Sequence, residues 1–233
     1  FIVAALAHAG GLSSAAGDVI NYAKVVPTFL FIFFAPLIGM FIAFVITIII
    51  VHLCKRSNPY KAENWFKKLQ LVSSAAFSIG HGGNDAQKVM GIIGAAIIFY
   101  EKNTHGVIKD FNTFVDAYPW VPFTSFLCIG IGTMSGGWKI VKTMGTKITK
   151  VTPLEGVAAE TAGAITLFMT EHFKIPVSTT HTITGAIIGV GATKRLSAVR
   201  WGVTVNLLWA WILTIPISAF IAAIFYAIIK LIV

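Results

Sequence analysis

Two long apolar runs limit the folds that this chain can adopt. Pro27–Leu53 contains no Asp, Glu, Lys or Arg, and Gly202–Ile229 is equally free of charge, although Pro216 lies within it. A transmembrane helix needs about 20 mostly apolar residues to cross about 30 Å of hydrocarbon. Both runs therefore predict membrane spans. The shorter, glycine-rich stretch Pro122–Gly137 predicts a third, closely packed span.

Composition and charge favour a lipid environment over water. Hydrophobic residues make up 56% of the 233 residues and charged residues only 12%, whereas soluble domains have about 25% charged residues. The net charge of +9 comes from lysines and arginines that lie between the apolar runs. No basic stripe with base-reading side chains is present, so we expect no nucleic-acid partner. Cys54 and Cys128 form no metal-binding or disulfide pattern and are interpreted as packing thiols.

The apolar runs divide the chain into four expected parts. The first residues, Phe1–Ala7, are typical of the end of an apolar helix and are not preceded by a signal peptide, so we expect part of the protein to be missing from this chain. The parts are residues 1–26, the end of a preceding helix and an external loop; 27–68, a transmembrane helix and a basic cytoplasmic loop; 69–200, a segment with a GGND break and an STTH hairpin; and 201–233, a C-terminal transmembrane helix.

Two further apolar stretches have polar centres. Leu69–Tyr100 is interrupted by "GHGGNDAQK" at Gly80–Lys88, and Thr161–Ala192 by "EHFKIPVSTTH" at Glu171–His181. Unwound backbone at membrane depth is tolerated only where protein or a water-filled cavity satisfies its polar groups. The interruptions therefore predict a functional chamber inside the membrane.

The distribution of basic residues predicts the topology. Segments 54–68, 138–160 and 193–201 are rich in Lys and Arg, which places them in the cytoplasm, whereas 101–120 has balanced charges and is expected outside. The stretch 161–192 then begins and ends inside, as a re-entrant hairpin does, and 69–100 crosses as a discontinuous helix. We thus expect an all-α, multi-pass membrane protein.

The two interruptions have the chemistry of an oxyanion site. Glycines and possible helix caps in "GGND", and Pro176 followed by three hydroxyl residues in "PVSTTH", predict free backbone N–H groups at two helix N-termini. Such ends favour anions, and hydroxyl donors can rotate toward a tetrahedral oxyanion. Half-helix N-termini near the bilayer midplane are a recurrent device of transporters. The predicted phosphate ligands are Asn84, Asp85, Gln87, Lys88, Ser178, Thr179 and Thr180.

Asp85 is the residue that argues for cation coupling. Its carboxylate would repel a nearby phosphate, so either the two share a proton or a cation lies close enough to neutralise the pair. Lys88, three residues later, has two possible roles, pairing with Asp85 or holding the anion. Glu160 is either a cation ligand or an interfacial residue. The predicted cation ligands are Asn84, Asp85, Thr180 and Glu160, with Na⁺ as the candidate metal ion at Asp85.

Other functions compete with this interpretation. A re-entrant-loop anion channel has similar elements, and a membrane enzyme would use Ser178 or Thr179 as nucleophile with His181 as base. No orienting acid stands at a useful spacing, so we do not expect an enzyme. His81 and His181 flank the interruptions without a metal-binding spacing, and we expect them to provide supporting hydrogen bonds. No cofactor is expected beyond the coupling ion.

Three motifs resemble the PiT family of inorganic phosphate transporters. They are "SIGHGGNDAQKVMGIIGAA" (Ser78–Ala96), "GIGTMSGGWKIVKTMG" (Gly130–Gly145) and "IPVSTTHTITGAIIGVG" (Ile175–Gly191), in the order found in the family's C-terminal half. The resemblance covers nearly the whole chain and, with the short 101–120 loop, implies a prokaryotic member located in the inner membrane. It implies cation-coupled symport of inorganic phosphate, or of a related oxyanion such as sulfate.

The resemblance also implies partners for the chain. The family is built from two inverted repeats, each with a GxND-type and an STTH-type element, and this chain contains one of each. Asn84, Asp85 and Ser178–Thr180 would then form half of a site, completed by the missing N-terminal half. Na⁺- and H⁺-driven members both exist, which leaves the coupling ion open. A second copy of the protein, in a homodimer, is a further expected partner.

Overall fold

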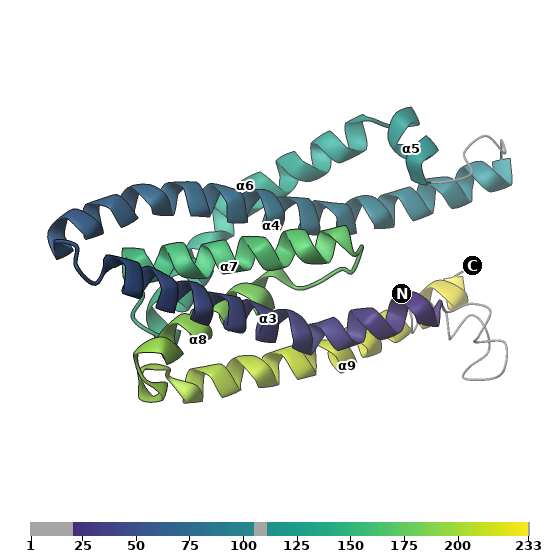
Figure 1. Cartoon of the computed structure of the whole chain (residues 1–233). Coiled ribbons are helices and arrows are strands. Elements are labelled where there is room, and N and C mark those ends of the chain that lie inside the picture. The colour runs from purple at the N-terminus through teal and green to yellow at the C-terminus, as the bar shows by residue number, and fades with distance from the viewer. Residues whose placement is uncertain (1–20, 105–110, 233) are drawn as a thin grey trace. The chain divides into compact units, whose positions relative to one another are not determined.

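The computed structural model describes residues 21–104 and 111–232, and all regular structure in these residues is helical (Figure 1), as predicted. The chain divides into two units, one formed by the residues up to Phe31 and from Arg200 onward, the other by Ile32–Val199. The expected helix end at Phe1–Ala7 lies outside the described residues. The helices are α3 (Tyr22–Cys54), α4 (Pro59–Thr104), α5 (Phe111–Ala117), α6 (Trp120–Thr143), α7 (Pro153–His172), α8 (Thr179–Lys194) and α9 (Trp201–Ile232).

Helices α3 and α9 contain the two predicted long spans. They have 33 and 32 residues, which at 1.5 Å per residue gives each a length of about 50 Å. Both are long and apolar enough to cross a membrane. Pro216 lies inside α9 without ending it. The third predicted span, Pro122–Gly137, lies within α6.

The expected break at Gly80–Lys88 is wrong, because α4 continues through it as one 46-residue helix. Glycine permits a break but does not force one, since each glycine costs a helix only about 1 kcal/mol relative to alanine. No proline is present, and Asp85 pairs with His81 and Lys88 on the same helix instead of capping a new one. Such (i, i+3) and (i, i+4) pairs stabilise a helix. Neither a discontinuous helix nor a second helix N-terminus exists here.

The second interruption does separate two helices. Helix α7 ends at His172, and the backbone N–H groups of Lys174 and Ile175 donate to the carbonyl oxygens of Glu171 and Thr170 at 2.9 and 3.0 Å. This pair of bonds is the Schellman motif, which closes helix C-termini. Helix α8 begins after Ser178, whose Oγ accepts a hydrogen bond from the backbone of His181 at 3.4 Å. The capping predicted for this segment is therefore confirmed.

An ion pair joins the two helices of this hairpin at the end opposite the tip, where α7 begins and α8 ends. Glu155, in the first turn of α7, accepts from the backbone N–H of Thr152 at 2.6 Å. Its other carboxylate oxygen pairs with the ammonium of Lys194, in the last turn of α8, at 2.5 Å. The Glu155 side chain is 8% exposed, so water competes little for this pair. The two arms are thereby joined at the end opposite the tip.

Small residues bring α8 close to α3 within the larger unit. Ala35, Gly39, Ala43 and Thr47 form a buried stripe along α3, one residue per turn. Across from it, a Cβ atom on Gly185 would overlap the carbonyl oxygen of Pro36. Membrane helices use such small residues to bring backbones together, because lipid provides no hydrophobic drive for helix association. The hairpin's second arm is therefore held against α3 by backbone contact.

Replacing Gly185 by alanine tests this packing. The added methyl group meets backbone that cannot rotate away, so we expect a loss of about 1–3 kcal/mol of stability, seen as a lower Tm of the purified full-length protein in detergent. Gly132→Ala is the matched control: a Cβ at Gly132 meets nothing within 4 Å, and its Tm should not fall. An unchanged Tm for Gly185→Ala would contradict the close packing.

Candidate functional site

The tip of the α7–α8 hairpin meets α4 at Asp85. One carboxylate oxygen, Oδ2, lies 3.0 Å from His81 Nε2 and 3.5 Å from Thr179 Oγ1, the latter at the long limit of a hydrogen bond. The other oxygen, Oδ1, accepts from Lys88 Nζ at 3.0 Å. Both oxygens of the carboxylate are thus engaged by groups of the protein itself. The supporting hydrogen bond expected of His81 is present.

Lys88 joins this carboxylate to the hairpin. Its Nζ also donates to the backbone carbonyl oxygen of Val177 at 2.7 Å, one residue before the cap of α8. An ammonium group has three donors, and these two bonds use two of them. Of the two roles considered for Lys88, pairing with Asp85 is the one seen in the structure.

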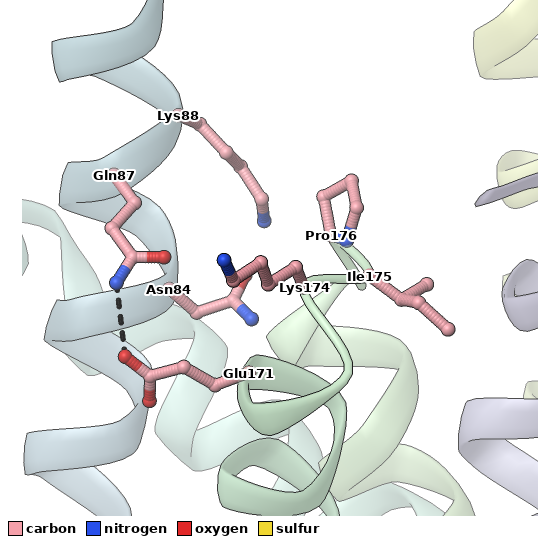
Figure 2. Close-up of a pocket in the computed structure, with 7 residues that line it drawn as sticks. All are labelled: Asn84, Gln87, Lys88, Glu171, Lys174, Ile175 and Pro176. Carbon is pink, nitrogen blue, oxygen red and sulfur yellow. Dashed lines mark hydrogen bonds between the residues drawn. The ribbon is translucent and has the colours of Figure 1, made fainter. Parts of the chain in front are cut away.

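A cavity of about 440 Å³ lies beside these contacts, between α4 and the hairpin tip. Figure 2 shows its side chains converging from the two elements, with the Gln87 amide donating to the Glu171 carboxylate at 2.9 Å. Its charged side chains are two lysines and one glutamate, and one of the lysines, Lys88, is paired with Asp85. The lining residues are Asn84, Gln87, Lys88, Glu171, Lys174, Ile175 and Pro176.

Asn84 brings a buried amide to this cavity. Asn84 is 6% exposed, and its Oδ1 atom has no hydrogen-bond partner among the described residues. An unsatisfied buried polar atom costs about 1–3 kcal/mol, a cost that a ligand bound to this oxygen would remove. An amide oxygen accepts from a hydroxyl of a protonated oxyanion, or coordinates a hard cation.

Lys174 occupies a position where glycine is the usual residue. It follows the end of α7 with φ of 55°, in the left-handed region, at the place that the Schellman motif reserves for a left-handed residue. A lysine in this conformation costs about 1–2 kcal/mol more than a glycine. Figure 2 shows its side chain extending from the tip toward α4.

The hydroxyl residues predicted as phosphate ligands have other contacts in the structure. Thr179 is buried and approaches Asp85, Ser178 caps α8, and the backbone carbonyl of Thr180 accepts from Thr184 Oγ1 at 2.7 Å. None of the three is among the described residues that line the cavity. The hairpin contributes only residues of its tip, between the end of α7 and Pro176, and α4 contributes Asn84, Gln87 and Lys88.

Glu160 lies apart from the other predicted cation ligands. Its Oε2 accepts from Ser73 Oγ at 2.6 Å, and Ser73 precedes Asp85 by twelve residues on α4. At 1.5 Å per residue this is about 18 Å along the helix axis. Glu160 is half-buried within α7, so it belongs to a second polar contact between α4 and α7 and not to the group around Asp85.

Two charged cavity residues, Glu171 and Lys174, are absent from the predicted ligands. Charged residues in the middle of an apolar stretch were the available signal. What the sequence could not give is that this tip packs against the turn of α4 that contains Gln87, 84 residues earlier in the chain.

Comparison with known proteins supports the family resemblance that the three sequence motifs predicted. The chain is 48% identical over 192 residues to a Rhizobium meliloti (strain 1021) protein named "Probable low-affinity inorganic phosphate transporter", covering 82% of this chain and 55% of that one. It is 40% identical over 227 residues to a Bacillus subtilis (strain 168) protein of the same name, covering 97% and 66%. The chain thus spans between about half and two thirds of the length of these relatives.

A solved structure shares the fold. The structure titled "The sodium-dependent phosphate transporter" superposes with a TM-score of 0.76 over 94% of this chain and 70% of the other, at 24% identity. Residues 54–222 also match the family described as "Phosphate transporter family". The resemblance found in the three motifs is confirmed: the chain belongs to the phosphate transporter family, a family of membrane transport proteins and not of enzymes.

Proposed function

We propose that the full-length protein transports inorganic phosphate across the prokaryotic plasma membrane together with a cation, Na⁺ or H⁺, and that the cavity between α4 and the hairpin tip binds the phosphate. The observation that supports this most directly is the cavity lining. Two ammonium groups and two side-chain amides converge there, beside the start of α8, in a chain of the phosphate transporter family.

The chemistry of the cavity suits a small oxyanion. Lys88 and Lys174 supply positive charge, and Gln87 and Asn84 supply amides that donate or accept as the protonation of phosphate requires. The N-terminal end of α8 lies beside the cavity, since Lys88 donates to Val177, and this end of a helix favours negative charge. Glu171 opposes the anion, but its carboxylate accepts from Gln87 and is partly neutralised by that bond.

The proposed membrane arrangement follows the basic loops. In this arrangement α7 and α8 form a re-entrant hairpin that enters from the cytoplasmic side, and Lys194 and Glu155 lie at its cytoplasmic end. We further propose that the full-length transporter contains a second, inverted copy of these elements that completes the site, and that it forms a homodimer. The greater length of the relatives leaves room for such a copy.

Transport by the full-length protein in liposomes is the direct test of the proposed function. We expect saturable uptake of labelled phosphate, driven by either a Na⁺ or a proton gradient, and the label should remain inorganic phosphate inside the vesicle. The two gradients are imposed separately, and protein-free liposomes give the background. Flux that does not saturate and needs no gradient would indicate an anion channel, and preference for sulfate over phosphate would overturn the proposed substrate.

Replacing Lys174 by glycine separates binding from stability. Glycine suits φ of 55°, so we expect the protein to gain about 1 kcal/mol of stability and its Tm to rise. The loss of the ammonium should raise KM for phosphate about tenfold or more, because hydrogen bonds to charged groups contribute about 1.5–3 kcal/mol.

Lys174→Arg is the matched control for this prediction. It keeps the charge and the left-handed backbone, so its Tm and KM should stay near those of the unaltered protein. A Lys174→Gly protein with a raised Tm and an unchanged KM would remove Lys174 from the binding site while leaving the Schellman motif intact.

A further inference from the structure

Lys88 stands where a coupling cation would otherwise be expected. A cation at Asp85 would seek the carboxylate oxygen together with nearby backbone carbonyls, because hard cations take oxygen ligands. The Lys88 ammonium donates to one oxygen of each kind: it lies 3.0 Å from Asp85 Oδ1 and 2.7 Å from the carbonyl oxygen of Val177. Two oxygens from α4 and from the hairpin tip therefore converge on a positive charge that the chain itself provides.

The remaining oxygen of Asp85 is occupied as well. Oδ2 lies 3.0 Å from His81 Nε2 and 3.5 Å from Thr179 Oγ1. Three donors from α4 and α8 thus surround one carboxylate. A metal ion at this position would have to displace the ammonium, which is attached to the same helix three residues away and therefore competes at a high effective concentration.

We infer that Lys88 is a resident counter-ion: its ammonium takes the place of a Na⁺ ion at Asp85, neutralises that carboxylate beside the bound anion, and fastens the hairpin tip to α4. The inference rests on the proposed function. It answers the problem posed by an acidic residue next to a phosphate site, since the required cation is part of the protein. Lys88 also lines the cavity, so the third donor of its ammonium remains for an anion.

The role of Lys88 has a consequence for ion selectivity. With the ammonium in place, Asp85 is not a Na⁺ ligand, and any response of the protein to Na⁺ arises elsewhere. Without the ammonium, Asp85 Oδ1 and the Val177 carbonyl become available oxygens next to an uncompensated carboxylate. Removal of the Lys88 charge should therefore create a Na⁺ site that the unaltered protein does not have.

Thermal unfolding of the purified full-length protein tests this without relying on transport. Tm is measured in NaCl and in choline chloride at equal ionic strength, for the unaltered protein and for Lys88→Gln, Lys88→Arg, Asp85→Asn and the double variant Lys88→Gln with Asp85→Asn. A ligand that binds the native state raises Tm. We expect Lys88→Gln to gain a Na⁺-dependent rise of about 2–4 °C beyond that of the unaltered protein, and the double variant to lose this gain.

The control variants define the other outcomes. Lys88→Arg keeps a positive charge and should show the same Na⁺ response as the unaltered protein, and so should Asp85→Asn. An equal Na⁺ response in Lys88→Gln and the unaltered protein would overturn the inference. The inference would also be overturned if Na⁺ raised the Tm of the unaltered protein and Asp85→Asn removed that rise. This comparison does not need Lys88→Gln, so it remains informative even if that variant does not fold.

Phosphate uptake in liposomes distinguishes failure of this inference from failure of the proposed function. With Lys88→Gln we expect uptake in choline to fall about tenfold or more, because the charge pair with Asp85 has been broken, and external Na⁺ to restore part of it. Lys67→Gln, at an exposed pair with Glu63 in the first turns of α4, is the control and should transport normally. Absence of uptake from every protein would refute the transport proposal and leave the Tm comparison to decide the role of Lys88.

Discussion

The structure around the cavity depends on how the Asp85 carboxylate is neutralised. A charged carboxylate that is half removed from water requires partners, and here three side chains supply them from two elements that are far apart in sequence. Because Lys88 also bonds to the Val177 carbonyl, the same interaction that satisfies Asp85 fixes the hairpin tip on α4. The Lys88 ammonium thus both neutralises Asp85 and holds the hairpin tip against α4.

This interaction also explains why α4 needs no break. A discontinuous helix would present backbone N–H groups to the anion, but it would separate His81, Asp85 and Lys88, which meet only because they lie one turn apart on a continuous helix. The two glycines in between are not required by the packing: a Cβ on Gly83 would make an ordinary contact with Glu171 Oε1 at 3.9 Å, and a Cβ on Gly82 would meet nothing within 4 Å. The side chains of α4, and not its backbone, therefore face the cavity.

How much the sequence could predict varies with the range of the interaction. The long spans follow from uninterrupted apolar runs, and the hairpin follows from Pro176 and the Ser178 cap, because these signals act within a few residues. The broken helix at Gly80–Lys88 was predicted from a polar centre, glycines and possible caps, all of which permit a break without forcing one. The bonds from Gln87 to Glu171 and from Lys88 to Val177 join residues 84 and 89 positions apart, and no local pattern specifies such pairs.

The tip of the hairpin shows the same link between local structure and the proposed binding site. The last carbonyl groups of a helix lack partners within the helix, and at the end of α7 the Schellman motif supplies them with the backbone N–H groups of Lys174 and Ile175. Glycine at position 174 would meet this requirement at lower conformational cost, but it would leave the cavity with a single lysine against Glu171. The second ammonium group of the cavity thus depends on a residue that the backbone alone would not favour. Strain of this kind persists where the surrounding contacts hold it and a function uses it.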